Sequence, residues 1–589
     1  MTAKVISLNI KPGIQRDGTQ FDASCYVDGK WVRFQRGRPR KIAGYKGIFQ
    51  NASGISRGMI MSSEDGLNYV YSGWSDGLEE WVTDNDDGVG SGPTTISLSD
   101  FTADALNLWQ MDIGFDSGGS GNQTLIAHPG LNLTNIDNTL NTPVLIGDFP
   151  TGAMSQVGVF TAAGVMVIGP PSVFTIASVN ALIAVGQTVT GTGVPANTTV
   201  SIVVVGASTT TVTLSNTVST SGALTLTFNN NISVSGGCVM LHPYLFVYGN
   251  NGLIKNCSAG NFQDWVSADA NENTVSAGKI VKGLPVRGGT TAPSGLFWSL
   301  DSLIRVSYAP TTVGASTIYW RYDVVTSQSS ILSSSCVIEY DGLFFWCGVD
   351  RFLMYNGVVT EVANNANINY FFDNVNYAQR QKVWASKIPR WGEIWWFYPR
   401  GNATECTDAI IYNVRDKVWY DAGEALGARR SAGTFSEVFR KPIWAGTETN
   451  DASTYTLWQH ETGTNVVNLS QESAIQSYFE TDSIGWVNGG PNQNDPVGMN
   501  NYIRLERVEP DFIQSEDMNL YVTGKGYASD VDVVSDAYVF SPTTLKIDMR
   551  EQRREMRLRF ESNIVNGNYN CGLNLLSADV GDMRSTGNP

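Results

Sequence analysis

The sequence predicts an all-β protein: a β-propeller of six or seven blades, interrupted by an inserted β-sandwich module and followed by a C-terminal β domain. Three observations predict this class. Sixty of the 589 residues are glycine, only 16% are charged, and short runs that end on an aliphatic–aromatic pair recur about every 45–60 residues. Gly-rich, weakly charged chains favour turn-rich sheets, and a β unit repeated at this spacing is typical of propeller blades. A pair of β-sandwiches is the alternative fold.

Changes in composition divide the chain into five predicted parts. They are a basic N-terminal arm with a β-hairpin (1–60), the first propeller blades (61–149), a neutral inserted β-sandwich module (150–235), the remaining blades (236–470) and a C-terminal β domain (471–589).

The N-terminal part carries a concentrated positive charge. Residues 1–60 hold eleven Lys and Arg against three Asp and Glu, whereas the whole chain has a net charge of −16. Most of these bases lie in a stretch that Gly and Pro divide into a hairpin pattern: Lys30, Arg33, Arg36, Arg38, Arg40, Lys41 and Lys46. Two interpretations stay open: an edge strand that positive charge protects from aggregation, or a surface that docks an acidic partner or contacts DNA.

The predicted insert has no charge at all. From Phe149 to Ile254 the sequence holds no Asp, Glu, Lys or Arg. Runs such as Val173–Val179, Val200–Val205 and Ala223–Phe228 alternate polar with apolar residues and are rich in β-branched side chains, which indicates strands. A disordered glycine-rich linker is the alternative.

Aromatic runs mark the clearest blades. The segments Glu339–Gly357, Trp391–Pro399 and Ile410–Trp419 combine Trp, Phe and Tyr with turn signals such as Asp-Gly and Asn-Gly. Rows of aromatic rings can form a sugar-binding platform, but packing between blades uses the same rings. We therefore assign them to the core.

The C-terminal domain holds a second basic run, Leu545–Ser562. Met556, Leu558 and Phe560 alternate there with Arg557, Arg559 and Glu561, which predicts a strand with one buried and one charged face. Its arginines are interface candidates together with those of the N-terminal arm. The candidates are Arg33, Arg36, Arg38, Arg40, Lys41, Arg550, Arg553, Arg554, Arg557 and Arg559.

The sequence supplies little that resembles a catalytic or metal site. The three histidines, His128, His242 and His460, lie far apart, and the seven cysteines include no C-x-x-C pair. We therefore expect no catalytic residue, metal or cofactor and no enzymatic activity. The acids of a propeller glycosidase would be scattered over several blades, so that class stays open. No segment has the length or apolar character of a signal peptide or a membrane span, and we expect a soluble chain made in a reducing cytoplasm.

Both ends of the chain resemble one family. The run Asp28–Tyr45 (DGKWVRFQRGRPRKIAGY), the arginine-rich run Leu545–Ser562 and Gly567–Gly572 (GNYNCG) are similar to the tail nozzle proteins of short-tailed, podovirus-like phages, which include tail tubular protein B and the packaged-DNA stabilisation proteins. The neutral insert departs from this family.

The resemblance implies a structural virion protein of the phage tail, assembled in the host cytoplasm. It implies a homo-oligomeric ring, a hexamer, that extends the portal–adaptor channel, retains packaged DNA and conducts it during ejection. The implied partners are the portal–tail adaptor ring, tail fibres or spikes, and double-stranded DNA that passes through the lumen without sequence recognition; no membrane insertion is implied. Two other classes stay open: a receptor-binding or glycan-binding propeller of the tail, with or without glycan-cleaving activity, and a host-encoded scaffold propeller.

Overall fold

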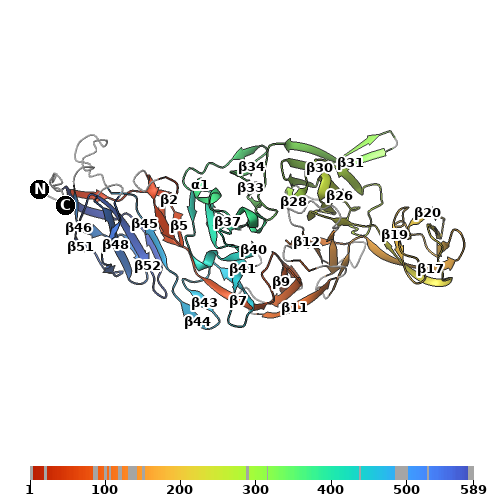
Figure 1. Cartoon of the computed structure of the whole chain (residues 1–589), viewed down its shortest axis with the longest axis horizontal. Helices are drawn as coiled ribbons and strands as arrows, with labels where there is room; N and C mark the ends of the chain where they lie inside the picture. Colours follow the sequence, from red (N-terminus) through yellow and green to blue (C-terminus); the bar gives the residue numbers. More distant parts are fainter. Residues whose placement is uncertain are drawn as a thin grey trace. The chain divides into compact units, whose positions relative to one another are not determined.

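A computed structural model describes residues 4–18, 23–64, 66–83, 90–98, 103–104, 108–116, 123–130, 142–148, 153–286, 291–314, 316–436, 439–484, 502–526 and 530–580 (Figure 1). The chain forms two compact bodies. We call residues 1–50, 350–352 and 361–589 the terminal body, and residues 51–349 and 353–360 the central body. Strands dominate both, and none of the helices in the described ranges has the length and apolar character needed to cross a membrane.

The central body is built from four-stranded antiparallel meanders, the unit of a propeller blade. Three sets form sheets of their own. They are β24 (Gly237–Leu241), β25 (Tyr244–Tyr248), β26 (Leu253–Asn256) and β27 (Asn271–Thr274); β28 (Ile280–Val286), β29 (Ser294–Ser299), β30 (Leu303–Val313) and β31 (Ser316–Thr326); and β32 (Ile338–Tyr340), β33 (Leu343–Cys347), β34 (Phe352–Tyr355) and β35 (Val359–Glu361).

Two more sets share one eight-stranded sheet, because β11 and β16 pair in parallel. The first set is β8 (Gly58–Glu64), β9 (Leu67–Trp74), β10 (Gly77–Thr83) and β11 (Gly90–Leu98); the second is β12 (Gln110–Phe115), β13 (Gln123–His128), β15 (Leu145–Asp148) and β16 (Ala153–Gln156).

The terminal body contains two further sets. One is β36 (Trp384–Ile388), β37 (Glu393–Tyr398), β38 (Asp408–Asn413) and β39 (Val418–Asp421); the other joins β40 (Arg430–Phe435), β41 (Pro442–Thr449) and β42 (Tyr455–His460) to β7 (Tyr45–Ala52), and β43 (Val466–Asn468) and β44 (Gln471–Ser473) extend its sheet. An N-terminal strand thus completes a sheet whose other strands lie some 400 residues later. The described strands give seven sets, within the predicted six or seven, and the all-β propeller fold class is confirmed.

Aromatic side chains fill the interior of these blades. Trp395, Trp396 and Phe397 of β37 are all 0% exposed. The ring centroids of Trp384 and Phe397 stack 4.3 Å apart, and Trp444 meets Phe397 edge-on at 4.9 Å. Such pairs stabilise beyond their buried area. The aromatic rows are therefore core, as predicted, rather than a sugar-binding platform.

The neutral segment folds into a module with its own core. We call residues Val159–Asn229 the neutral module. Its strands are β17 (Val159–Val167), β18 (Val173–Ile176), β19 (Thr188–Thr190), β20 (Val200–Val205), β21 (Thr210–Leu214) and β22 (Gly222–Asn229), and they form one sheet in the order β19-β22-β17-β18-β21-β20. A bridge between Thr188 and Thr199 brings the two ends of the sheet together. The interpretation as a disordered linker is therefore wrong.

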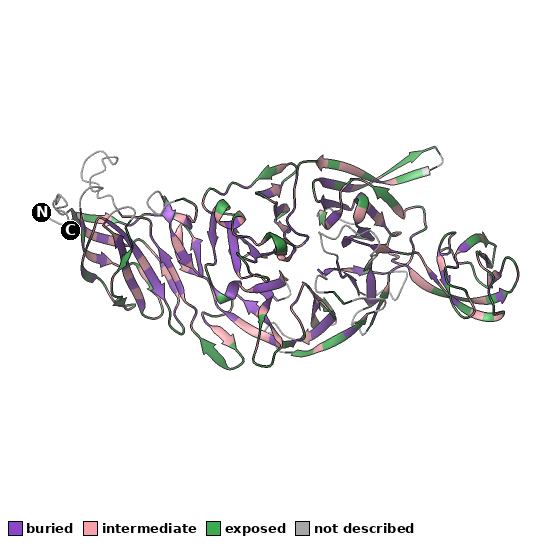
Figure 2. Cartoon of the chain, viewed as in Figure 1, coloured by how far each residue is buried: buried purple, intermediate pink, exposed green. Residues whose placement is uncertain are grey.

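The C-terminal domain is interleaved with the start of the chain. Its strands include β45 (Ser477–Glu480), β46 (Ile503–Glu509), β47 (Phe512–Gln514), β48 (Met518–Lys525), β51 (Ile547–Arg553), β52 (Glu555–Ser562), β53 (Tyr569–Cys571) and β54 (Leu575–Val580). N-terminal strands pair with three of them: β1 (Lys4–Ser7) with β54, β4 (Asp28–Lys30) with β45, and β6 (Arg38–Lys41) with β53. Figure 2 shows the buried residues that run through these sheets.

Candidate functional site

The basic arm forms the predicted hairpin. β5 (Val32–Gln35) pairs with β6 in antiparallel register, Phe34 opposite Pro39 and Gln35 opposite Arg38. The connecting residues Arg36 and Gly37 have φ of 53° and 76°, as a two-residue type I′ turn requires. The turn therefore leaves the Arg36 side chain exposed at the tip.

Two of the predicted interface residues in this hairpin are interior instead. Arg33 is 1% exposed, and its guanidinium lies 2.6 Å from Glu461 Oε1 and 2.8 Å from Glu393 Oε1. Lys41 is 2% exposed and donates from Nζ to the Gly567 carbonyl at 2.6 Å. Burial lowers the pKa of Lys41 to about 8. Neither side chain is available to a partner, because each stabilises its own fold.

Cations that remain accessible gather around Trp391. The guanidiniums of Arg40 and Arg390 lie 4.8 and 5.0 Å from the Trp391 ring centroid, and Arg33 lies 4.8 Å from it. No described carboxylate forms an ion pair with Arg40 or Arg390. Burial, together with the neighbouring charges of Arg33 and Arg390, lowers the pKa of Arg40. We call Arg40, Arg390 and Trp391, together with the exposed Arg36 at the tip of the same hairpin, the cationic cluster.

Sequence reasoning missed Arg390. It lies more than 300 residues from the hairpin. The only signal in the sequence that could have identified it is its position directly before Trp391, the first residue of an aromatic run. Arg38, which the sequence did nominate, is half-buried and donates weakly to the Leu8 carbonyl at 3.4 Å.

The arginines of the C-terminal run also divide into buried and accessible groups. The apolar face of β52 is buried as predicted, but the opposite face is not open to solvent: Arg557 is 2% and Glu561 7% exposed. Arg557 bridges Glu480 at 3.3 Å and Asp532 at 2.6 Å. Arg559 lies 3.6 Å from the Tyr478 ring centroid and pairs with Glu561. Arg557 and Arg559, which the sequence nominated as interface candidates, therefore have partners in their own chain.

The remaining candidates lie nearer the surface. Arg550 is exposed, Arg553 pairs with Glu551 at 3.0 Å, and Arg554 is half-buried.

The charged face of β52 lines a polar cleft of about 550 Å³ in the terminal body. Its ionisable side chains are Arg16, Asp28, Glu480, Asp532, Arg557, Arg559 and Glu561. Burial raises the pKa of Glu480, and Arg557 opposes that rise. Glu480 is thus a carboxyl group that holds a proton more readily than usual, beside a second carboxylate on the same arginine. This arrangement could bind a polyhydroxylated ligand or supply a general acid.

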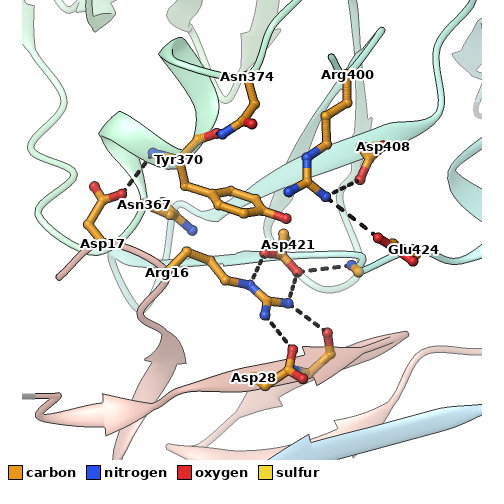
Figure 3. Close-up of polar contacts among 12 residues, drawn as sticks. Arg16, Asp17, Asp28, Asn367, Tyr370, Asn374, Arg400, Asp408, Asp421 and Glu424 are labelled. Atoms are coloured by element: carbon orange, nitrogen blue, oxygen red, sulfur yellow. Dashed lines mark hydrogen bonds and ion pairs between the residues drawn. The ribbon is translucent and has the colours of Figure 1, made fainter. Parts of the chain in front are cut away.

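An ion-pair network continues from this cleft (Figure 3). Arg16 binds Asp421 through Nε at 2.7 Å and Nη2 at 3.0 Å, and its Nη1 contacts Asp28. Burial alone would lower the pKa of Arg16, but Asp421 and Asp28 outweigh it and raise that pKa. Asp421 ends β39, so this arginine fastens the N-terminal segment to a blade.

The other half of the network holds the short helix α1 (Ile368–Phe372). The Asp17 carboxylate accepts the backbone N–H groups of Asn369 at 2.9 Å and Tyr370 at 2.7 Å, a capping role. The guanidinium of Arg400 lies 4.5 Å from the Tyr370 ring centroid and 3.6 Å from Asp408. Burial raises the pKa of Tyr370 to about 12. These contacts hold α1 and the N-terminal segment in place.

The histidines do not meet. His460 is buried and accepts a hydrogen bond from Arg430 Nε at 2.9 Å, and burial together with Arg430 lowers its pKa. Within the described ranges, no group of three or more His, Cys, Asp and Glu side chains is arranged to hold a metal ion.

No family model and no curated protein matches this sequence. Solved structures similar to it include an exo-β-1,3-galactanase from Phanerochaete chrysosporium, with a TM-score of 0.23, 8% identity, and 91% of this chain and 100% of that chain covered. A glycoside hydrolase has a TM-score of 0.21 and 8% identity over 89% of this chain and 100% of its own. A putative exported protein from Bacteroides fragilis has a TM-score of 0.24 and 9% identity over 62% of this chain and 98% of its own.

The likeness to glycoside hydrolases contradicts the expectation of a chain without enzymatic activity, and we withdraw that expectation. At these scores the likeness assigns a catalytic role to no residue of this chain.

Proposed function

We propose that this chain is a tail nozzle protein of a short-tailed phage, a ring-forming wall of the channel through which DNA leaves the virion. The observation that supports this most is that the segments carrying the family resemblance, more than 500 residues apart, fold together. Arg40 of the hairpin pairs with Asn570, and Lys41 donates to the Gly567 carbonyl. In the next sheet β4 pairs with β45, which pairs with β52. The resemblance therefore covers one structural unit rather than two unrelated fragments.

Charge fits the role. With a net charge of −16, the chain repels the phosphates of DNA, so a wall built from it lets DNA slide without binding. The cationic cluster is a local exception, with Arg36 and Arg390 exposed. We assign it to docking on an acidic surface of the adaptor ring, a contact that salt should weaken.

A direct test uses the purified chain and the adaptor ring of the same phage. We expect Arg36→Glu with Arg390→Glu to weaken association at least about tenfold, because both charges oppose an acidic partner. Arg321→Glu is the matched control, since Arg321 is exposed in the central body. Unchanged binding by the double variant, or an image of the virion in which the chain is absent from the tail axis, contradicts the proposal.

The polar cleft favours a second candidate, a tail propeller that binds or cleaves glycans. Glu480, with its raised pKa, and Asp532 share Arg557 there. We expect the chain, incubated with host polysaccharide, to release reducing ends, and Glu480→Gln to abolish that release. Equal release by Glu480→Gln, or none by the parent chain, argues against cleavage at this cleft.

A further inference from the structure

The neutral module presents an outer face that is aliphatic and uncharged. In antiparallel sheets, paired residues point to the same face, so the strand registers define rows that cross β17, β18, β21 and β20. The first row is Val165, Thr175, Thr211 and Val204, and the second is Val167, Val173, Thr213 and Ile202. The side chains between these rows, such as Phe174 and Val212, are 0% exposed and form the module's core.

Aliphatic side chains in both rows are largely exposed. Val165 and Val167 are 53% and 60% exposed, and Ile202 and Val204 are 54% and 58% exposed. Single exposed aliphatic side chains are ordinary, but three valines and an isoleucine on one face without any charged neighbour form a patch typical of a contact surface.

The strand β20 lies next to this patch, and of its described residues only the first, Val200, meets the β19 segment, through hydrogen bonds with Gly186 and Gln187. Over Ile202–Val205 it pairs with β21 on one side, and no described residue pairs with its other side. Proteins protect such edges with Lys, Pro or inward charges. The sequence of β20 is Val-Ser-Ile-Val-Val-Val, which has none of these, and its one irregularity lies between Val200 and Ile202.

Charge identifies the occupant of this edge. Copies of a chain with net charge −16 repel each other, and the stretch Phe149–Ile254 is where two copies can approach without bringing like charges together. An edge strand without charge is also complementary to itself, because antiparallel pairing about a two-fold axis sets the same residues on both sides.

We propose that two copies of this chain associate through their β20 strands, which pair antiparallel and join the two neutral modules into one continuous sheet. Backbone hydrogen bonds form along Ile202–Val205, and Ile202 and Val204 of each copy pack against the other. This contact uses no residue of the cationic cluster, so it does not rest on the proposed function. It supplies a link between copies, or between rings of copies.

The first test is the mass of the full chain in solution as a function of concentration, by sedimentation velocity. We expect a monomer–dimer equilibrium that 1 M salt does not weaken. Ile202→Lys with Val204→Lys should weaken dimerisation by about tenfold or more, because like charges then face each other across the pair. Leu545→Lys is the matched control, since Leu545 is 86% exposed and lies outside the module. A parent chain that is monomeric throughout, or a double variant that dimerises like the parent, overturns the proposal.

A second test does not depend on how well the lysine variants fold. All seven native cysteines are buried, so a cysteine introduced at Ile202 or Val204 is the accessible thiol. Oxidation with diamide should give a covalent dimer from at least one of these variants and none from Leu545→Cys. Equal crosslinking by the control, or none by either module variant, contradicts β20 pairing. The proposal is also contradicted if β20 associates only with a different protein and not with a second copy of this chain.

Discussion

The basic hairpin and the neutral module reverse the usual relation between polarity and exposure in opposite ways. In the hairpin, Arg33 and Lys41 are buried, whereas the module leaves Ile202 and Val204 more than half exposed. The buried cations have partners within the chain, at Glu461 and at the Gly567 carbonyl. None of the described residues covers the exposed aliphatic side chains of the module. A buried cation and an exposed aliphatic side chain therefore each indicate a partner. For the hairpin this partner lies in the same chain, and for the module it lies in another molecule.

The largest expected effect comes from removing the internal partner of the hairpin. Arg33→Ala leaves Glu393, which is 0% exposed, as an uncompensated buried charge. The free energy of unfolding of the terminal body should fall by about 3–5 kcal/mol. Urea unfolding followed by tryptophan fluorescence measures it. Arg36→Ala is the control, expected within about 0.5 kcal/mol of the parent because Arg36 is exposed. Equal losses in the two variants would mean that Arg33 is not a structural cation.

The next largest effect on stability is expected at Asp482, which follows β45 in the terminal body. Burial raises the pKa of Asp482 to about 6, so the folded chain favours its protonated form. This contribution to stability is complete below about pH 4, is lost progressively as the pH rises from 4 to 6, and is absent above that. At pH 7, Asp482→Asn should therefore raise the free energy of unfolding by up to about 3 kcal/mol.

Urea midpoints of both proteins from pH 4 to pH 8 test this expectation. The two curves should converge near pH 4, separate progressively between pH 4 and pH 6, and keep a constant separation above pH 6. Parallel curves would show that Asp482 titrates normally.

Local patterns in the sequence predicted the strands, the blade repeat, the hairpin and the ordered module, because turn residues and side-chain alternation act over a few positions. Exposure was less predictable. Arg557 sits on the charged side of an alternating strand, yet it is buried because Glu480 and Asp532 approach it from distant segments. Nothing near Trp391 in the sequence shows that Arg40 lies against its ring. The polar cleft and the cationic cluster both depend on contacts across hundreds of residues, which periodicity does not encode.

A smaller effect on stability is expected at Asp17, whose carboxylate binds backbone N–H groups and not a cation. Asp17 accepts two N–H groups of α1, so Asp17→Ala should cost about 0.5–2 kcal/mol of stability in the terminal body. Asp350→Ala removes a largely exposed acid that pairs with its neighbour Arg351 and is the control. Thermal unfolding of the two variants measures the difference. A cost no greater than that of the control would show that α1 does not depend on this cap.

The smallest expected effect lies in the module. Val204→Lys should change the stability of the isolated chain by no more than about 0.5 kcal/mol, since the side chain is 58% exposed and has no internal partner to lose. Phe174→Ala, in the core of the same sheet, should cost about 3–5 kcal/mol and provides the matched comparison. Thermal unfolding at a concentration too low for association separates the two. A large loss of stability in Val204→Lys would mean that Val204 packs against a partner within its own chain. The contrast with Arg33, whose partner is internal, would then no longer hold.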